Sequence, residues 1–286
     1  MNLTYAQAIK YTQLSLSSDG NLIALGYVDK NSNEVVDIVK ISGMPNLKAQ
    51  RLSLGTMQAF TIAFGMHPES LLITTRSKNR FELVRVNVTN VKNPKIDKLY
   101  SHSVSLRFPK EMEGNRIVFL EQIDGSSGSS VWRVFDGVKT HNTISQVFSL
   151  AAWPNIVGAN AFLPIPVKGK GIVDIVGRAP DVIREFYGTS DGFMVCADSN
   201  EPIVCLKNDV TILMTESFGE LIVNKGGQIC KVPGQWKESH PFEISGNGKY
   251  AIFQGISRGE RRRGLYLIEM DDRECRAQPI NIDRQN

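Results

Sequence analysis

Apolar and polar positions repeat along the chain in a fixed order, at steps of roughly 45 residues. In each step a short apolar run leads into a polar turn and a second apolar run. In the first step, alternating polarity and many β-branched residues predict strands at Leu22–Val28, Val35–Ile41 and Ala49–Leu54. The second step predicts strands at residues 59–64, 70–75, 81–88 and 96–100. No segment with a helical period interrupts them, so the pattern predicts an all-β chain.

The repeat predicts one domain. The first strand of each unit is expected to begin near Leu14, Phe60, Val104, Val147, Phe193 and Phe242. Units of four strands at this length are typical of the blades of a β-propeller, a ring that hides its apolar faces between neighbouring blades. We predict a single propeller of six four-stranded blades over residues 1–286. A seven-blade count stays open, because prolines interrupt the fourth and fifth units at positions 154, 164, 166 and 180.

The predicted blade boundaries are residues 12–56, 57–101, 102–144, 145–188, 189–238 and 239–286. A ring also needs a closing strand. Residues 1–11 supply one candidate, because Leu3–Ala8 fits the outermost strand of the last blade. Alternatively, Ala277–Ile282 fills that place. Either closure brings the two termini close together.

Two turn motifs, one near each end of the chain, are nearly alike. Ser17–Asn21 reads Ser-Ser-Asp-Gly-Asn, and Ser245–Lys249 reads Ser-Gly-Asn-Gly-Lys. The Asp-Gly or Asn-Gly step supplies the left-handed turn that joins the two inner strands of a blade. The motif between two apolar strands resembles the TolB-type, WD-like propeller repeat. This resemblance implies the fold but no particular activity, because such propellers host many functions.

Composition limits the class and the compartment. The hydrophobic fraction of 42% and the charged fraction of 22% are typical of a soluble globular protein. The sequence shows neither a secretory signal at its start nor an apolar stretch of membrane-spanning length. The four cysteines, at positions 196, 205, 230 and 275, lack the close spacing of a zinc site or redox motif. They are expected to be reduced thiols that fill strands, which together with the missing signal favours a cytoplasmic protein.

The net charge of +4 is mild, so the distribution of charge matters more than its total. The loops between the second and third strands carry cations in alternate blades. These cations are Arg76, Lys78, Arg80, Lys168, Lys170, Arg258, Arg261, Arg262 and Arg263. All these loops emerge on one face, which would attract acidic protein segments, phosphates or an anionic membrane surface. The competing interpretation is that charged hairpin tips only keep the propeller soluble.

Two further features bear on partners. Trp236 is expected to be a packing residue, and its alternative role is that of an exposed anchor for a partner. Few aromatic residues lie between the basic residues of these loops, and the sequence contains no recognisable nucleic-acid-binding motif. Nucleic acid is therefore disfavoured as a partner.

Three histidines suggest an enzyme as the alternative. His102, His141 and His240 fall in predicted connections between blades, where imidazoles could ligate a metal or act as general bases. Oligogalacturonate lyases, which are among the TolB-like propellers that this chain resembles, hold a metal with channel histidines. The opposing interpretation is that these histidines are structural or face solvent.

Motifs for phosphate-binding loops, dinucleotide binding, zinc hydrolysis and calcium loops are missing. The sequence therefore favours a non-catalytic, cofactor-free interaction module that docks an acidic or other anionic partner within a larger complex. The alternative is a metal-dependent lyase or hydrolase that acts on an anionic saccharide in the central channel.

Overall fold

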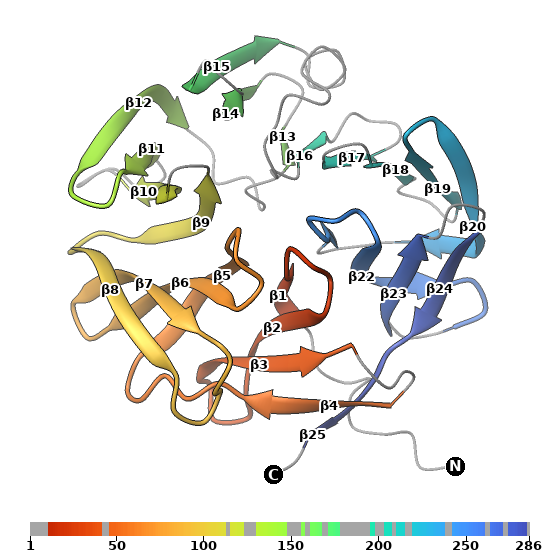
Figure 1. Ribbon diagram of the computed structural model, residues 1–286, viewed down its shortest axis with the longest axis horizontal. Coiled ribbons are helices and arrows are strands. Elements are labelled where there is room, and N and C mark those ends of the chain that lie inside the picture. The colour runs from red at the N-terminus through yellow and green to blue at the C-terminus, as the bar shows by residue number, and fades with distance from the viewer. Residues whose placement is uncertain are drawn as a thin grey trace.

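The computed structural model describes most of the chain. The described residues are 11–41, 46–112, 115–122, 130–147, 156–157, 161–167, 171–177, 195–197, 203–207, 210–214, 219–237, 242–260, 264–270 and 274–284. They form β-strands and no α-helix, which confirms the all-β prediction. The strands lie in sheets arranged around a central space, as in a propeller (Figure 1). No helix of the described residues is long and apolar enough to cross a membrane.

The first sheet joins the two ends of the described chain. Its strands are β1 (Tyr11–Leu16), β2 (Leu22–Val28), β3 (Glu34–Lys40), β4 (Asn46–Arg51) and β25 (Asn281–Arg284). Strands β1 to β4 form an antiparallel meander from the inside outwards, and β25 then pairs with β4 in parallel (Figure 1). The C-terminal strand therefore adds the outer edge of the first sheet.

The second and third sheets are also four-stranded meanders. Their strands are β5 (Gln58–Phe64), β6 (Ser70–Ser77), β7 (Arg80–Asn87) and β8 (Lys95–His102), then β9 (Leu106–Met112), β10 (Arg116–Gln122), β11 (Ser130–Phe135) and β12 (Thr140–Val147). The prediction that an inner strand begins near Val147 is wrong. Val147 ends β12, an outer strand, where it pairs with Ser130.

The remaining described strands are β13 to β24. Their bounds are β13 (Ile156–Val157), β14 (Ala161–Val167), β15 (Gly171–Gly177), β16 (Val195–Ala197), β17 (Ile203–Lys207), β18 (Val210–Met214), β19 (Gly219–Lys225), β20 (Gln228–Lys237), β21 (Phe242–Ile244), β22 (Tyr250–Ser257), β23 (Gly264–Met270) and β24 (Cys275–Pro279). Strands β14 and β15 form a hairpin, and β21 to β24 form the last meander.

The last meander bears on ring closure. Its outer strand β24 overlaps the segment Ala277–Ile282 that the sequence offered for this place. The competing segment Leu3–Ala8 lies outside the described residues. The blade count and the blade boundaries stay predictions.

Apolar side chains fill the spaces between neighbouring sheets. Strand β6 shows why its sequence is a nearly continuous apolar run. Leu71 and Ile73 pack into a core shared with the first sheet, whereas Leu72 packs on the other side with Phe119 of the third sheet. Since successive side chains of a strand point to opposite faces, a strand buried on both sides needs apolar residues at every position.

The two motif turns have the same internal structure. In the first, Asp19 Oδ1 accepts hydrogen bonds from the Ser17 hydroxyl at 2.6 Å and from the Asn21 amide at 3.0 Å. In the second, Asn247 Oδ1 accepts the equivalent bonds from Ser245 at 2.7 Å and from Lys249 at 3.0 Å. Each turn contains a left-handed glycine, with φ of 76° at position 20 and 63° at position 248. The predicted left-handed turn is thus present in both copies.

These two turns also contact each other where the first and last sheets meet. The backbone amide of Asn247 donates to Ser18 O at 2.8 Å, and its side-chain amide donates to Asp19 O at 2.6 Å. The repeat motif therefore serves twice, as a turn within each sheet and as a hydrogen-bonded contact across the seam of the ring.

Replacing Asn247 by Ala should lower the free energy of unfolding by about 1–2 kcal/mol, because the carbonyl of Asp19 and two turn donors lose their partner. Urea denaturation measures this loss. Asn31→Ala is the matched control, since Asn31 is an exposed loop asparagine between β2 and β3. Equal stability of the two variants would contradict this role for Asn247.

Candidate functional site

One side of the ring carries the turns between second and third strands. In an antiparallel meander, these turns and the connections to the next sheet emerge on the same side. The β6–β7 hairpin, with Arg76, Lys78 and Arg80, therefore lies on the same side as the connection from β8 to β9. We name this side the hairpin face; it also bears the β2–β3 and β22–β23 turns. The structure thus brings part of the predicted basic set to one side of the ring.

Two arginines and two phenylalanines lie next to one another on the hairpin face. The Arg76 guanidinium lies 5.9 Å from the ring centre of Phe81, its register partner on β7. Phe81 lies 5.8 Å from the ring of Phe60 on β5. The Arg107 guanidinium on β9 covers Phe60 at 4.6 Å. We name Arg76, Phe81, Phe60 and Arg107 the arginine–phenylalanine ladder, which bridges the second and third sheets.

The carboxylate of Glu34, on the first sheet, interacts electrostatically with Arg76 and Arg107. Burial raises the pKa of Glu34, while the charges of Arg76 and Arg107 act in the opposite direction. Burial likewise lowers the pKa of Arg107, and Glu34 opposes that shift. Arg107 is therefore partly withdrawn from water, whereas Arg76 is exposed, and partial burial strengthens the interaction of the Arg107 charge with any ion that binds there.

Among the described residues, no carboxylate oxygen lies within 4.0 Å of a side-chain nitrogen of Arg76 or Arg107, so neither arginine forms an ion pair there. Within the described part of the chain, Arg107 Nε donates to the Ser105 hydroxyl at 3.3 Å. Other partly buried arginines do have such partners. These pairs are Arg51–Asp37 at 2.8 Å, Arg133–Glu121 at 2.8 Å, and Arg85–Glu111. The ladder arginines thus keep hydrogen-bonding capacity that the other arginines use within the fold.

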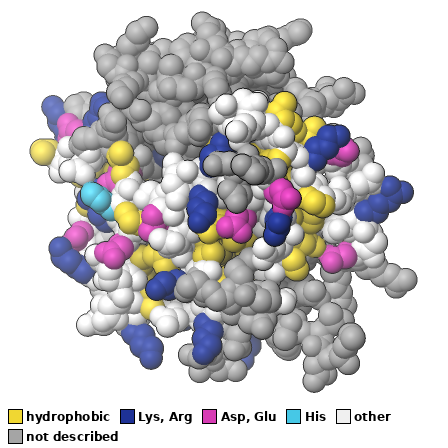
Figure 2. All heavy atoms as spheres, turned by 45° about the vertical axis from the view of Figure 1, so that its right-hand side comes forward, with side chains coloured by type: hydrophobic (Ala, Val, Ile, Leu, Met, Phe, Trp, Pro, Cys, Tyr) yellow, Lys and Arg dark blue, Asp and Glu magenta, His cyan; other side chains and the backbone are white. Residues whose placement is uncertain are grey.

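The rest of the predicted basic set is dispersed or undescribed. Arg258 follows β22, is exposed, and donates both its backbone amide and its guanidinium to Gln235. Lys168, Lys170, Arg261, Arg262 and Arg263 lie outside the described residues. On the face seen in Figure 2, Lys and Arg side chains alternate with Asp and Glu. In that view, the described surface has mixed charges, so attraction of an anion would be local.

Trp236 is a packing residue, and the alternative that it is an exposed partner anchor is wrong. Its side chain is 6% exposed and belongs to a hydrophobic core cluster. It packs edge-on against Phe253 at 5.2 Å and Tyr266 at 4.7 Å. Trp236 on β20 pairs with Ser257 on β22, and this strand pairing brings it next to Phe253 and Tyr266 of the last meander.

The structure separates two of the predicted metal-binding histidines. His102 ends β8, where its Nδ1 accepts a hydrogen bond from the Val104 amide at 3.2 Å. His141 lies near the beginning of β12, opposite Val134. Strands β8 and β12 are both the fourth strands of their sheets. The end of β8, with His102, and the beginning of β12, with His141, therefore lie on opposite sides of the ring.

His240, the third member, lies outside the described residues. Across the described ranges, no group of three or more His, Cys, Asp and Glu side chains is placed to hold a metal ion.

Sequence reasoning missed four residues of the site. Phe60, Phe81, Arg107 and Glu34 come from four strands in three sheets, and no local motif joins them. The available signal was modest: Phe81 follows the basic hairpin directly, and Arg107 follows a predicted connection between blades. Their proximity depends on how neighbouring sheets are placed.

Comparisons with known proteins give structural matches alone. No protein-family model and no curated protein matches the chain. The propeller domain of the Trilobed protease from Pyrococcus furiosus is similar at 11% identity, over 89% of this chain and 78% of that chain, with a TM-score of 0.43. TolB from Acinetobacter baumannii is similar at 12% identity, over 96% and 54%, with a TM-score of 0.37.

The acylaminoacyl peptidase from Pyrococcus horikoshii is also similar, at 11% identity, over 93% of this chain and 44% of that chain, with a TM-score of 0.43. The chain thus spans about half the length of the peptidase and of TolB. The β-propeller assignment rests on the strand order of this chain.

The raised pKa of Glu34 predicts a pH-dependent loss of stability. Folded Glu34 holds its proton to higher pH than the unfolded residue, whose ordinary pKa is 4.5, so its contribution to the free energy of unfolding falls as pH rises above that value. Glu34→Gln removes this loss. The stability of the variant relative to the unmodified protein should therefore increase from pH 4.5 to 7, as measured by urea denaturation.

The control is Glu69→Gln, which removes the same charge from an exposed turn on the opposite side of the ring. If the free energy of unfolding of Glu34→Gln minus that of the unmodified protein stayed constant or decreased from pH 4.5 to 7, ionisation of Glu34 would not be unfavourable in the folded protein.

Proposed function

We propose that this chain is a non-catalytic propeller module that docks an acidic segment of a partner protein at the arginine–phenylalanine ladder. The observation that carries the proposal is Arg107, which is half-buried on Phe60 without an ion-pair partner among the described residues. Partial burial of a charge is costly unless an opposite charge and hydrogen bonds compensate for it. A carboxylate from a partner would supply both.

The stacking geometry favours a carboxylate ligand. A guanidinium that lies over an aromatic ring keeps its N–H edge available, and that edge matches the two oxygens of a carboxylate. Arg76 and Arg107 stand at the two ends of the ladder, with Phe81 and Phe60 between them. An extended segment with spaced acidic residues could thus bind both cations, while its apolar atoms contact the rings.

Charges around the ladder shape the affinity and its selectivity. Exposed Lys78 and Arg80 add positive charge at the hairpin tip, which increases the rate of encounter with acidic segments and weakens with added salt. Glu34 opposes them, because its carboxylate repels a bound anion while it is ionised. Binding therefore needs specific placement of the partner's carboxylates rather than negative charge alone.

A rigid ring suits a docking role within a larger complex. Its sheets have short edges, so partners are expected to bind at loops and strand ends rather than by strand addition. The enzyme alternative, a metal-dependent lyase or hydrolase, would need its histidines to converge. His102 and His141 stand on opposite sides of the ring, which gives this alternative no shared site in the described part of the chain.

Replacing Arg76 or Arg107 by Gln should each weaken binding of a labelled deca-glutamate peptide by about tenfold or more, because each change removes a charge-assisted hydrogen bond. Fluorescence anisotropy at low and at physiological salt measures the dissociation constants. The unmodified protein should bind more weakly at the higher salt.

Lys139→Gln is the control, since it removes one positive charge from an exposed turn on the opposite side of the ring. Circular dichroism checks that all variants stay folded. Equal weakening by the arginine variants and the control would assign binding to net charge and overturn the ladder as the docking site.

A further inference from the structure

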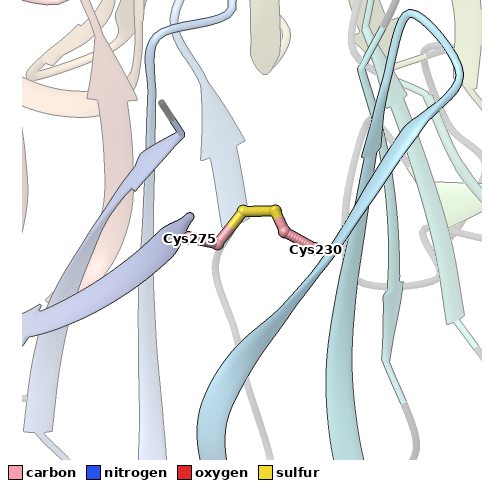
Figure 3. The surroundings of a disulfide bond; sticks show 2 residues. All are labelled: Cys230 and Cys275. Carbon is pink, nitrogen blue, oxygen red and sulfur yellow. A yellow bond between two sulfur atoms is a disulfide. The ribbon is translucent and has the colours of Figure 1, made fainter. Parts of the chain in front are cut away.

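A disulfide joins two strands that are not neighbours in their sheet. Cys230 on β20 is bonded to Cys275 on β24, with Cα atoms 5.8 Å apart (Figure 3). The hydrogen-bonded order runs β20, β22, β23, β24, so the disulfide spans the last meander. Both residues border a hydrophobic core that includes Trp236. The expectation of reduced thiols is therefore wrong for these two cysteines.

The backbone register places the other two cysteines together as well. Cys196 on β16 and Cys205 on β17 are direct partners in an antiparallel pair. Direct partners have Cα atoms about 4.5 or 5.5 Å apart, depending on their hydrogen bonding. Both values lie within the range of about 4.4–6.8 Å that disulfides require. The register thus meets the main geometric condition for a second bond, and no described cysteine is free.

We propose that all four cysteines form two disulfides, Cys196–Cys205 and Cys230–Cys275, and that the protein acquires them in an oxidising compartment. Four cysteines allow three connectivities. The structure selects one of these, because each cysteine already stands beside one particular partner. This proposal differs from the expectation of a cytoplasmic protein, which relied on reduced thiols together with the missing secretory signal.

The chemistry needs an external oxidant. For each bond, two thiols lose two protons and two electrons as the sulfur–sulfur bond forms. The electrons pass to a small disulfide, such as glutathione disulfide, or to the disulfide of a thiol–disulfide oxidoreductase, which becomes a pair of thiols. Exchange proceeds through a mixed disulfide, in which a protein thiolate attacks the oxidant and the second protein thiolate then displaces it.

The two bonds would act at different ranges. Cys230–Cys275 joins residues 45 positions apart and holds the last meander against β20. Cys196–Cys205 closes a short hairpin in the same continuous sheet. Both therefore reinforce the part of the ring between β16 and β24, while the first three sheets contain no cysteine.

Trypsin separates the possible connectivities. The full-length folded chain is equilibrated in a glutathione redox buffer, alkylated without reduction and digested. Residues 185–207 form one peptide with both Cys196 and Cys205, whereas Cys230 and Cys275 fall in the peptides 226–231 and 274–276. Mass spectrometry should find peptide 185–207 unalkylated and two hydrogen atoms lighter than its dithiol form. It should also find 226–231 linked to 274–276.

Two results would overturn the proposal. One is alkylated Cys196 and Cys205, which would show free thiols despite the oxidant. The other is a link from peptide 185–207 to 226–231 or 274–276, which would show another connectivity. As a control, Cys275→Ser should abolish the link between the two short peptides and leave the bond within 185–207 intact. Loss of that internal bond as well would contradict two independent pairs.

Discussion

Each sheet of this ring buries apolar faces against its neighbours, so the fold depends on the contact between the first sheet and the last. That contact has an apolar and a polar part. Leu25 and Val39 of the first sheet share a core with Ile252 and Leu267 of the last. Next to this core, Asn247 binds the turn that follows β1 through two hydrogen bonds. Strand β25 then continues from the last meander to the edge of the first sheet. Without this closure, both sheets would expose an apolar face, which is the liability that ring closure removes.

The same architecture decides where binding chemistry remains available. Among the inner strands, Lys110 on β9 pairs with Glu243 on β21 at 3.4 Å, and both side chains are largely buried. Such pairs contribute to the arrangement of the inner strands, and breaking one leaves an uncompensated charge. On the hairpin face, by contrast, Arg76 and Arg107 stack on rings and have no such carboxylate among the described residues. In the docking that we propose, an external anion would bind both arginines without disturbing the core.

The sequence predicted elements well where the evidence was local. The strand Leu22–Val28 matches β2 at both ends, because its apolar run lies between an Asp-Gly turn and a polar loop. The hairpin at Arg76–Arg80 was also predicted, since polar residues separate two apolar runs. Properties that depend on neighbouring sheets could not be derived. The burial of Trp236 depends on pairing between β20 and β22, and the ladder combines three sheets. Cysteine spacing likewise gives no sign that Cys230 meets Cys275, because the chain folds a complete meander between them.

Binding of an acidic segment at the ladder can be located by hydrogen–deuterium exchange with mass spectrometry. Exchange is compared in the free protein and with saturating deca-glutamate peptide. Docking at the ladder predicts slower exchange in two segments, residues 76–81 and 103–108, which contain Arg76, Phe81 and Arg107, while exchange in the turn at residues 136–139 on the opposite side stays unchanged. Protection confined to other parts of the ring, or no protection at saturation, would contradict docking at the ladder.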